Sequence, residues 1–141
     1  MRQISTSIEV KAPPEAVWMV LTDLDRYQEW NPFIQKASGR LAEGATLELL
    51  MCPAQGKART FHPRVLTVDP GRRLRWIGRF IMPGVFDGAH EFILEPTVEG
   101  ARVVQREDFS GILVPFVGKI IDNTERDFTA LNQALKLRAE S

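Results

Sequence analysis

The sequence predicts an α+β domain in which a curved antiparallel sheet of about seven strands wraps around a long C-terminal helix. Three observations lead to this expectation. Residues 3–10 alternate between polar and apolar side chains with a period of two, as a half-buried strand does. Strand-like segments separated by turn residues then follow between residues 33 and 110. Finally, apolar residues from about Val114 to about Arg138 recur at three- and four-residue spacing, which is typical of one amphipathic helix.

Two short helices are expected after the first strand. Pro13 and Pro14 break the strand and suit the first turn of a helix, whose apolar face includes Val17 and Leu21. Residues 23–29 form a second helical turn that ends before Trp30-Asn31-Pro32, because proline biases the residue before it away from helix. We interpret this tripeptide as a structural closure in which Trp30 is an apolar plug, in preference to a pocket wall.

The expected strands of the central region are joined by turns too short for crossover helices. They are Phe33–Ser38, Thr46–Cys52, Thr60–Asp69, Arg73–Phe80, Ala89–Glu95 and Ala101–Ser110. Connections this short favour an antiparallel meander.

An internal cavity follows from this arrangement. The strands and the helix each have one apolar face, and both are buried if the helix lies against the sheet. Asn132 and Lys136 fall on the opposite, polar face of the helix. One helix cannot fill the whole concavity of a coiled seven-stranded sheet, so space remains between the two.

Composition excludes several classes of protein. The chain has 141 residues, which fits one domain spanning 1–141. Eighteen basic residues balance eighteen acidic ones, so the overall charge gives no reason to expect nucleic acid or an anionic membrane as a partner. No apolar run has the length of a membrane span, so we expect no stable membrane insertion. The single Cys52 cannot form an internal disulfide, and a cytoplasmic location is expected.

The concave faces of the last strands and of the helix supply the expected ligand-binding residues. In the strand Arg73–Phe80, for example, Trp76 faces inward, whereas Arg75 and Arg79 face the solvated convex side. For Trp76, pocket wall and plain core are equally supported. The full expected set is Trp76, His90, Phe92, Leu94, Val103, Gln105, Glu107, Phe109, Val117 and Ile121.

His90 and Glu107 are the candidate polar anchor and the candidate catalytic residues. If the short turn near residues 97–100 closes a hairpin with Pro96 opposite Ala101, His90 lies directly opposite Glu107. A pair that only neutralises itself is an equally supported interpretation, and catalysis ranks third. A register slip of one residue would send one partner to the solvent.

The segment from Phe80 to Phe86 is unusually apolar for a loop. We interpret it as the cavity mouth, formed by Phe80, Ile81, Met82 and Phe86. A dimer contact, a membrane-touching tip and a loop folded over the core remain as alternatives.

Four segments carry a resemblance to a known superfamily: residues 12–18 (APPEAVW), 27–33 (YQEWNPF), 68–76 (VDPGRRLRW) and 107–111 (EDFSG). Together with the order of elements, they make the chain resemble the START-like (Bet v 1-like, or SRPBCC) superfamily, in particular its polyketide cyclase/dehydrase-like branch. The resemblance covers nearly the whole chain. It implies a helix-grip fold with an internal pocket. Relatives bind lipids, sterols, plant hormones, flavonoids, ubiquinone or polyketides, and a minority are cyclases, dehydratases or ring hydroxylases.

These observations favour a protein that binds a hydrophobic, lipid- or polyketide-like small molecule in its cavity. The first alternative is a polyketide cyclase/dehydratase-like enzyme that uses acid/base groups there, and the second is a protein-interaction module. No catalytic signature is recognisable, so a binding protein is favoured over an enzyme. We expect no cofactor and no metal, because His62 and His90 lack ligand-like spacing. The protein is expected to be a monomer or a homodimer.

Overall fold

The computed structural model describes residues 1–80 and 82–141. Along the chain, the elements are β1 (Arg2–Val10), α1 (Pro14–Thr22), η1 (Leu24–Glu29), β2 (Ile34–Ser38), β3 (Glu48–Met51), β4 (Arg59–Phe61), β5 (Arg64–Asp69), β6 (Arg73–Phe80), β7 (Phe86–Pro96), β8 (Ala101–Ser110), η2 (Val114–Phe116) and α2 (Gly118–Glu140). The two η elements are single stretches of 3₁₀-helix.

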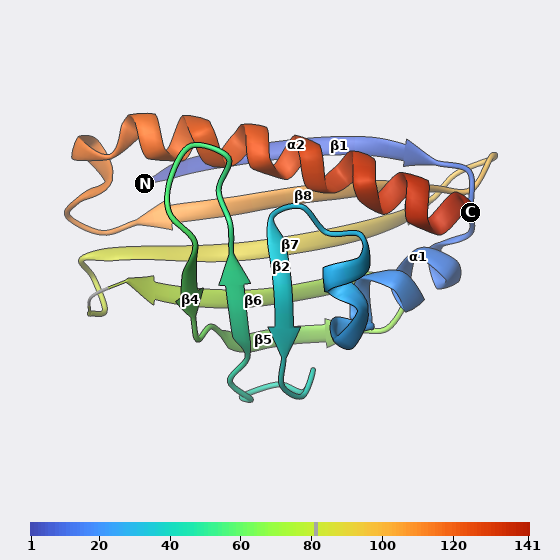
Figure 1. The fold of residues 1–141 in the computed structure, drawn as a ribbon, viewed down its shortest axis with the longest axis horizontal. Helices are drawn as coiled ribbons and strands as arrows, with labels where there is room; N and C mark the ends of the chain where they lie inside the picture. Colours follow the sequence, from blue (N-terminus) through green and yellow to red (C-terminus); the bar gives the residue numbers. More distant parts are fainter. Residues whose placement is uncertain (81) are drawn as a thin grey trace.

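The strands form two antiparallel sheets, and the long helix lies along the larger one. The larger sheet has the order β1-β8-β7-β6-β5, and the smaller has the order β2-β3-β4. Figure 1 shows α2 running along the length of the large sheet, beside β1 and β8, with the N-terminus at one end and the C-terminus at the other. The expected α+β helix-grip fold is confirmed. In the described part of the chain, no helix is long and apolar enough to cross a membrane.

The expected strand Thr60–Asp69 is in fact two strands, which raises the expected seven to eight. The break falls at His62-Pro63, between β4 and β5. Proline has no N–H to donate to a ladder and restricts the residue before it, so the pairing cannot continue through this point. The chain passes here from the small sheet to the large one, and an isolated bridge between Thr46 and Arg64 connects the two.

The expected C-terminal helix is also divided near its start. Pro115 lies in η2, Val117 has a non-helical backbone, and α2 begins at Gly118. Glycine and proline are the weakest helix formers, which accounts for the interruption. The apolar stripe of α2 then packs into the core through Ile121, Phe128, Leu131 and Leu135, all fully buried.

The short helices are closed by the Trp-Asn-Pro segment. The Asn31 side-chain oxygen accepts hydrogen bonds from the N–H groups of Phe33 and Ile34, at 3.0 and 2.8 Å. Trp30 packs edge-on against the fully buried Tyr27, whose ring centroid is 5.2 Å away. Burial raises the pKa of the Tyr27 hydroxyl well above its ordinary value. This geometry agrees with the expected role of structural closure.

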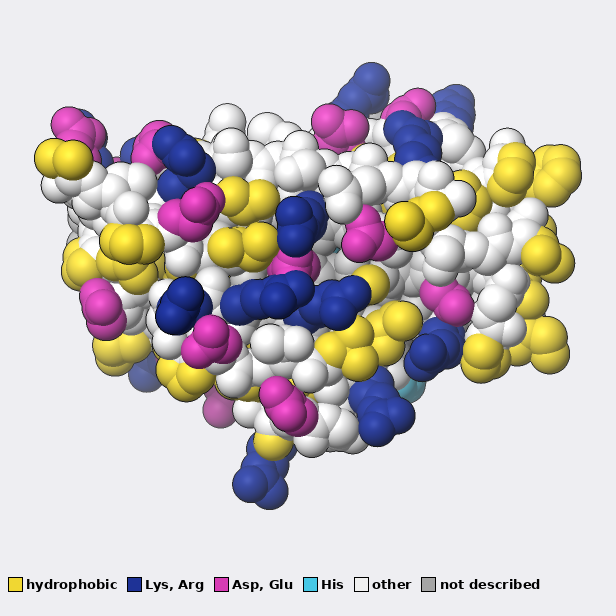
Figure 2. All heavy atoms as spheres, turned by 180° about the vertical axis from the view of Figure 1, so that it is seen from behind, with side chains coloured by type: hydrophobic (Ala, Val, Ile, Leu, Met, Phe, Trp, Pro, Cys, Tyr) yellow, Lys and Arg dark blue, Asp and Glu magenta, His cyan; other side chains and the backbone are white. Residues whose placement is uncertain are grey.

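We expected the arginines on the convex face of the large sheet to form a solvated row, and the structure differs from this expectation. Figure 2 shows Lys and Arg side chains gathered across the middle of this face. Beneath them Glu91 is only 3% exposed. The Arg106 Nε donates to Glu91 Oε1 at 2.6 Å, and Arg73 pairs with the other oxygen. Two arginines therefore cover a carboxylate, and Arg79 is the exposed member of the row.

Candidate functional site

The β7–β8 hairpin has the register that the sequence predicts. Pro96 lies opposite Ala101, and His90 lies opposite Glu107. The His90 Nδ1 and the Glu107 Oε1 are 3.0 Å apart. His90 is 1% exposed and Glu107 is 7% exposed, so the pair is shielded from solvent on the concave side of the sheet.

Aromatic rings enclose the His90 imidazole on several sides. Trp76 of β6 stacks on it with a centroid distance of 5.0 Å and an interplanar angle of 18°. Phe128 of α2 meets the imidazole edge-on with a centroid distance of 4.7 Å, and Phe92, which lies on β7 with His90, has a centroid distance of 4.8 Å. The ring is thus held between the sheet and the helix, which fixes its orientation.

The two nitrogens of the His90 imidazole have different surroundings. An ionised Glu107 carboxylate can only accept, so Nδ1 carries the hydrogen of that bond and Nε2 of a neutral ring is an acceptor. The Nε2 atom is buried without a hydrogen-bond partner among the described residues. Such a group is costly to bury and is therefore a natural contact point for a polar group of a ligand.

A glycine makes room for the Glu107 carboxylate. A Cβ at Gly88 would lie 2.2 Å from Glu107 Oε2, so any side chain there would displace the carboxylate. Gly78 lies opposite Gly88 on β6, where a Cβ would meet nothing closer than the Phe80 ring at an ordinary 3.7 Å. The glycine that makes room for Glu107 is therefore Gly88.

A second buried polar cluster links the sheet to α2. Gln105 Nε2 donates to the Phe128 carbonyl at 3.1 Å and to Asn132 Oδ1 at 2.7 Å. Asn132 Nδ2 in turn donates to Thr6 Oγ1 at 2.8 Å. Asn132 is 2% exposed, so its assignment to the polar face of the helix was wrong. The side-chain oxygen of Gln105, Oε1, is buried with no hydrogen bond to the residues that the structure describes.

Sequence reasoning missed Asp127, the residue before Phe128. It is 6% exposed, and its Oδ1 accepts from the Ala54 N–H at 3.1 Å, which ties α2 to the β3–β4 connection. Its Oδ2 is buried and unpartnered within the described ranges. Burial raises the pKa of the Asp127 carboxyl, and the bond from Ala54 partly offsets that rise. A single acidic residue on a helix gives no sequence signal for burial, so nothing in the pattern could have identified it.

The remaining expected wall residues lie on the same concave side. Six are buried in the core: Trp76, Phe92, Leu94, Val103, Phe109 and Ile121. Val117 is half-buried at the start of α2. The expected set therefore lies in or against the core formed by the large sheet and α2.

A row of phenylalanines connects this face with the expected mouth. The ring centroids of Phe61 and Phe80 are 4.7 Å apart, and those of Phe80 and Phe86 are 5.2 Å apart. Phe86 stacks on Phe109 with a centroid distance of 5.6 Å. Phe80 and Phe86 are half-buried, and Met82 is 58% exposed. Ile81, the fourth expected mouth residue, lies outside the described residues.

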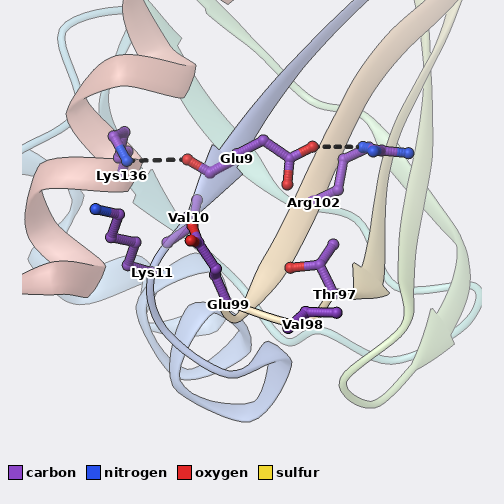
Figure 3. Close-up of a pocket in the computed structure, with 8 residues that line it drawn as sticks. All are labelled: Glu9, Val10, Lys11, Thr97, Val98, Glu99, Arg102 and Lys136. Atoms are coloured by element: carbon purple, nitrogen blue, oxygen red, sulfur yellow. Dashed lines mark hydrogen bonds and ion pairs between the residues drawn. The ribbon is translucent and has the colours of Figure 1, made fainter.

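A surface groove of about 330 Å³ lies at the other end of the molecule, between β1, the β7–β8 turn and α2. Figure 3 shows the bonds that cross it: Arg102 binds the Glu9 side chain at 2.7 Å, and Lys136 binds the Glu9 carbonyl at 3.0 Å. Six of the eight residues that line it are polar or charged, and the other two are Val10 and Val98. No cluster of three or more potential metal ligands occurs within residues 1–80 and 82–141.

Solved structures share this fold over nearly their whole length. The Zhui aromatase/cyclase from Streptomyces sp. R1128 superposes with a TM-score of 0.80 at 21% identity, covering 99% of this chain and 93% of that one. Protein CV1439 from Chromobacterium violaceum superposes with a TM-score of 0.73 at 22% identity, covering 100% of this chain and 99% of that one. Protein TTHA0849 from Thermus thermophilus superposes with a TM-score of 0.77 at 19% identity, covering 98% of this chain and 97% of that one.

A comparison with curated proteins found no match. The family described as "Polyketide cyclase / dehydrase and lipid transport", in contrast, matches residues 1–140. The match extends over both sheets and α2, including His90, Glu107 and Asp127. The chain therefore belongs to the polyketide cyclase / dehydrase and lipid transport family.

Proposed function

We propose that this protein binds an apolar small molecule between the concave face of the large sheet and α2, with His90 and Glu107 as its polar anchor. The observation that carries the proposal is the buried, unpartnered Nε2 of a histidine that is oriented by a carboxylate and surrounded by aromatic rings. The proposal treats residues 1–141 as one ligand-binding domain.

The buried Nε2 atom carries an energetic cost. A buried polar group without a hydrogen bond costs about 1–3 kcal/mol, and a ligand hydroxyl that donates to Nε2 would remove this cost. The surrounding rings would contact the apolar body of the ligand, as in most small-molecule sites. Phe128 now packs against His90, so binding requires its ring to move aside.

These features define the class of ligand. It has an apolar body, for the wall of Trp76, Phe92 and Phe109, and at least one polar group, for His90. Gln105 Oε1, which has no partner among the described residues, belongs to the residue whose side-chain nitrogen donates to the Phe128 carbonyl. A second polar group on the ligand is therefore compatible with the site. Lipid-like and polyketide-like molecules both meet this description.

A second candidate function is cyclase/dehydratase-like catalysis on such a ligand. The specific observation is that Glu107 holds the His90 imidazole by one nitrogen and leaves the other unpartnered, as an acid/base catalyst requires. One similar structure is that of a protein described as an aromatase/cyclase. Recovery of the bound ligand chemically unchanged after prolonged incubation would favour the binding protein over the enzyme.

A double-mutant cycle tests the anchor. His90→Ala and Glu107→Gln should each weaken binding of the ligand extracted from the protein by about tenfold, which corresponds to about 1.4 kcal/mol. The double variant should lose less than the sum, because the two residues act as a unit. The control pair is His62→Ala and Glu48→Gln, an exposed histidine and carboxylate 3.3 Å apart, which should bind as the unmodified protein does. Strictly additive losses for His90 and Glu107 would refute the paired anchor.

A further inference from the structure

Four large apolar side chains are exposed together at the end of the molecule that holds the β6–β7 turn and the start of α2. We call them the apolar tip: Met82, Ile112, Phe116 and Ile120, exposed by 58, 72, 81 and 57%. Figure 2 shows hydrophobic side chains gathered at the corresponding end, on the right of that view. Isolated apolar residues on a surface are ordinary, but a contiguous group marks an interaction site.

The backbone holds the tip together. Residues 82–86 and 110–118 contain no charged side chain. The two segments are joined by hydrogen bonds from Ile112 N to the Gly84 carbonyl at 3.1 Å and from Leu113 N to the Val85 carbonyl at 3.0 Å. Gly111 has a φ of +113°, and a Cβ there would come within 2.4 Å of the Val85 oxygen, so only glycine allows this approach. The exposure of the tip is therefore built into the fold.

Two cationic side chains border the tip. Arg79 and Lys119 flank the two uncharged segments, are exposed, and form no ion pair with any described residue. Of the acidic groups nearby, Asp122 pairs with Arg2. Asp87, which lies opposite Arg79 in the sheet, accepts from the Gly84 N–H at 3.1 Å and keeps its charge. The chain has no net charge overall, but this end presents cations beside apolar side chains.

The size of the tip decides against a second copy of the chain as its partner. A stable protein interface buries about 800 Å² on each side. A whole phenylalanine side chain contributes roughly 150–250 Å², and the other three side chains are smaller, so the tip presents only several hundred Å². Insertion into the interfacial region of a bilayer needs no complementary shape and is strengthened by cations near anionic headgroups.

We propose that the apolar tip docks reversibly on the surface of an anionic phospholipid bilayer. Phe116 and Ile112, the most exposed of its side chains, enter the headgroup region, and Arg79 and Lys119 contact anionic headgroups. The row Phe80–Phe86–Phe109 starts beside the tip and ends two residues from Glu107, so docking brings the mouth to the lipid. This last consequence rests on the proposed function, whereas the docking itself does not.

Vesicle sedimentation tests the docking with the full chain. The protein is mixed with vesicles of phosphatidylcholine and phosphatidylserine, and the bound fraction is measured for the unmodified protein and for Ile112→Ser/Phe116→Ser. The variant should bind at least about tenfold more weakly, because each change removes a large apolar side chain from the surface that inserts. The matched control is Met19→Ser/Leu137→Ser, whose side chains are 72 and 71% exposed on α1 and near the end of α2, and it should bind as the unmodified protein does.

Two further measurements make the outcome decisive. Arg79→Gln/Lys119→Gln should weaken binding to the mixed vesicles and leave binding to pure phosphatidylcholine unchanged. Affinity for the extracted ligand in solution should be the same for the tip variant and the unmodified protein, so docking and ligand binding succeed or fail separately. Docking is refuted if the unmodified protein does not sediment with vesicles, or if the tip variant sediments equally well. A dimer in analytical ultracentrifugation that the tip variant abolishes would assign the tip to a second copy and overturn the proposal.

Discussion

Replacing Gly88 with alanine tests the geometry of the His90–Glu107 pair without touching either residue. Gly88 is not among the glycines with positive φ, so its backbone accepts alanine. The new Cβ would lie 2.2 Å from Glu107 Oε2, and ordinary contact begins near 3.4 Å, so the carboxylate must retreat by about 1 Å. Because Oε2 and Oε1 belong to one rigid carboxylate, we expect this movement to lengthen the 3.0 Å bond between Glu107 Oε1 and His90 Nδ1.

The expected cost is that of unmaking one buried, charge-assisted hydrogen bond, about 1–3 kcal/mol in the free energy of unfolding. The matched control is Gly78→Ala, directly opposite on β6, where the new Cβ meets nothing closer than 3.7 Å. This change should be neutral or slightly stabilising, because alanine restricts the unfolded chain.

Urea unfolding followed by tryptophan fluorescence measures both variants, and ¹⁵N NMR of the imidazole reports the Nδ1 hydrogen bond. Gly88→Ala should unfold at lower urea concentration than Gly78→Ala and should shift the His90 ring signals. Equal midpoints together with unchanged His90 signals would refute the geometry described for the pair.

Two further predictions concern α2. Burial raises the pKa of the Asp127 carboxyl in the folded state above its ordinary value of 3.8. Between these two pKa values the folded protein binds a proton more readily than the unfolded chain does, so the free energy of unfolding falls as pH rises through that range. Asp127→Asn keeps the acceptor for the Ala54 N–H and removes the charge. The variant should therefore be more stable than the unmodified protein at neutral pH and should lose that advantage below pH 3.8. Parallel curves of unfolding free energy against pH for the two proteins would contradict this. Val117→Trp fills space at the start of α2 and should lower the affinity for an apolar fluorescent dye while the thermal melt stays cooperative; undiminished dye binding by a folded variant would contradict it.

The hairpin register could be predicted because its determinants are local. A short turn and the period of two on both strands leave few alternatives that keep apolar residues on one face. The same alternation correctly placed Trp76 and Phe92 on the concave side. The break at Pro63 had a sequence signal as well, since proline inside a strand pattern argues against a continuous strand.

The polar groups that are buried could not be predicted in this way. Asn132 and Asp127 border the apolar stripe of α2 on its two sides. Asn132 is covered by the sheet, and Asp127 meets the β3–β4 connection. Glu91 alternates onto the convex face, yet arginines of both neighbouring strands cover it. In each case burial depends on contacts between segments far apart in the sequence, which periodicity within one segment does not report.

The central claim is that an apolar small molecule binds at His90 and Glu107 between the large sheet and α2. Native mass spectrometry of the protein purified from its own host tests it most directly, with His90→Ala purified in parallel. The account predicts that the unmodified protein carries one small apolar molecule with at least one polar group, and that His90→Ala carries less of it. An unmodified protein that emerges without a bound molecule and takes up none from a lipid extract of the host would contradict the account.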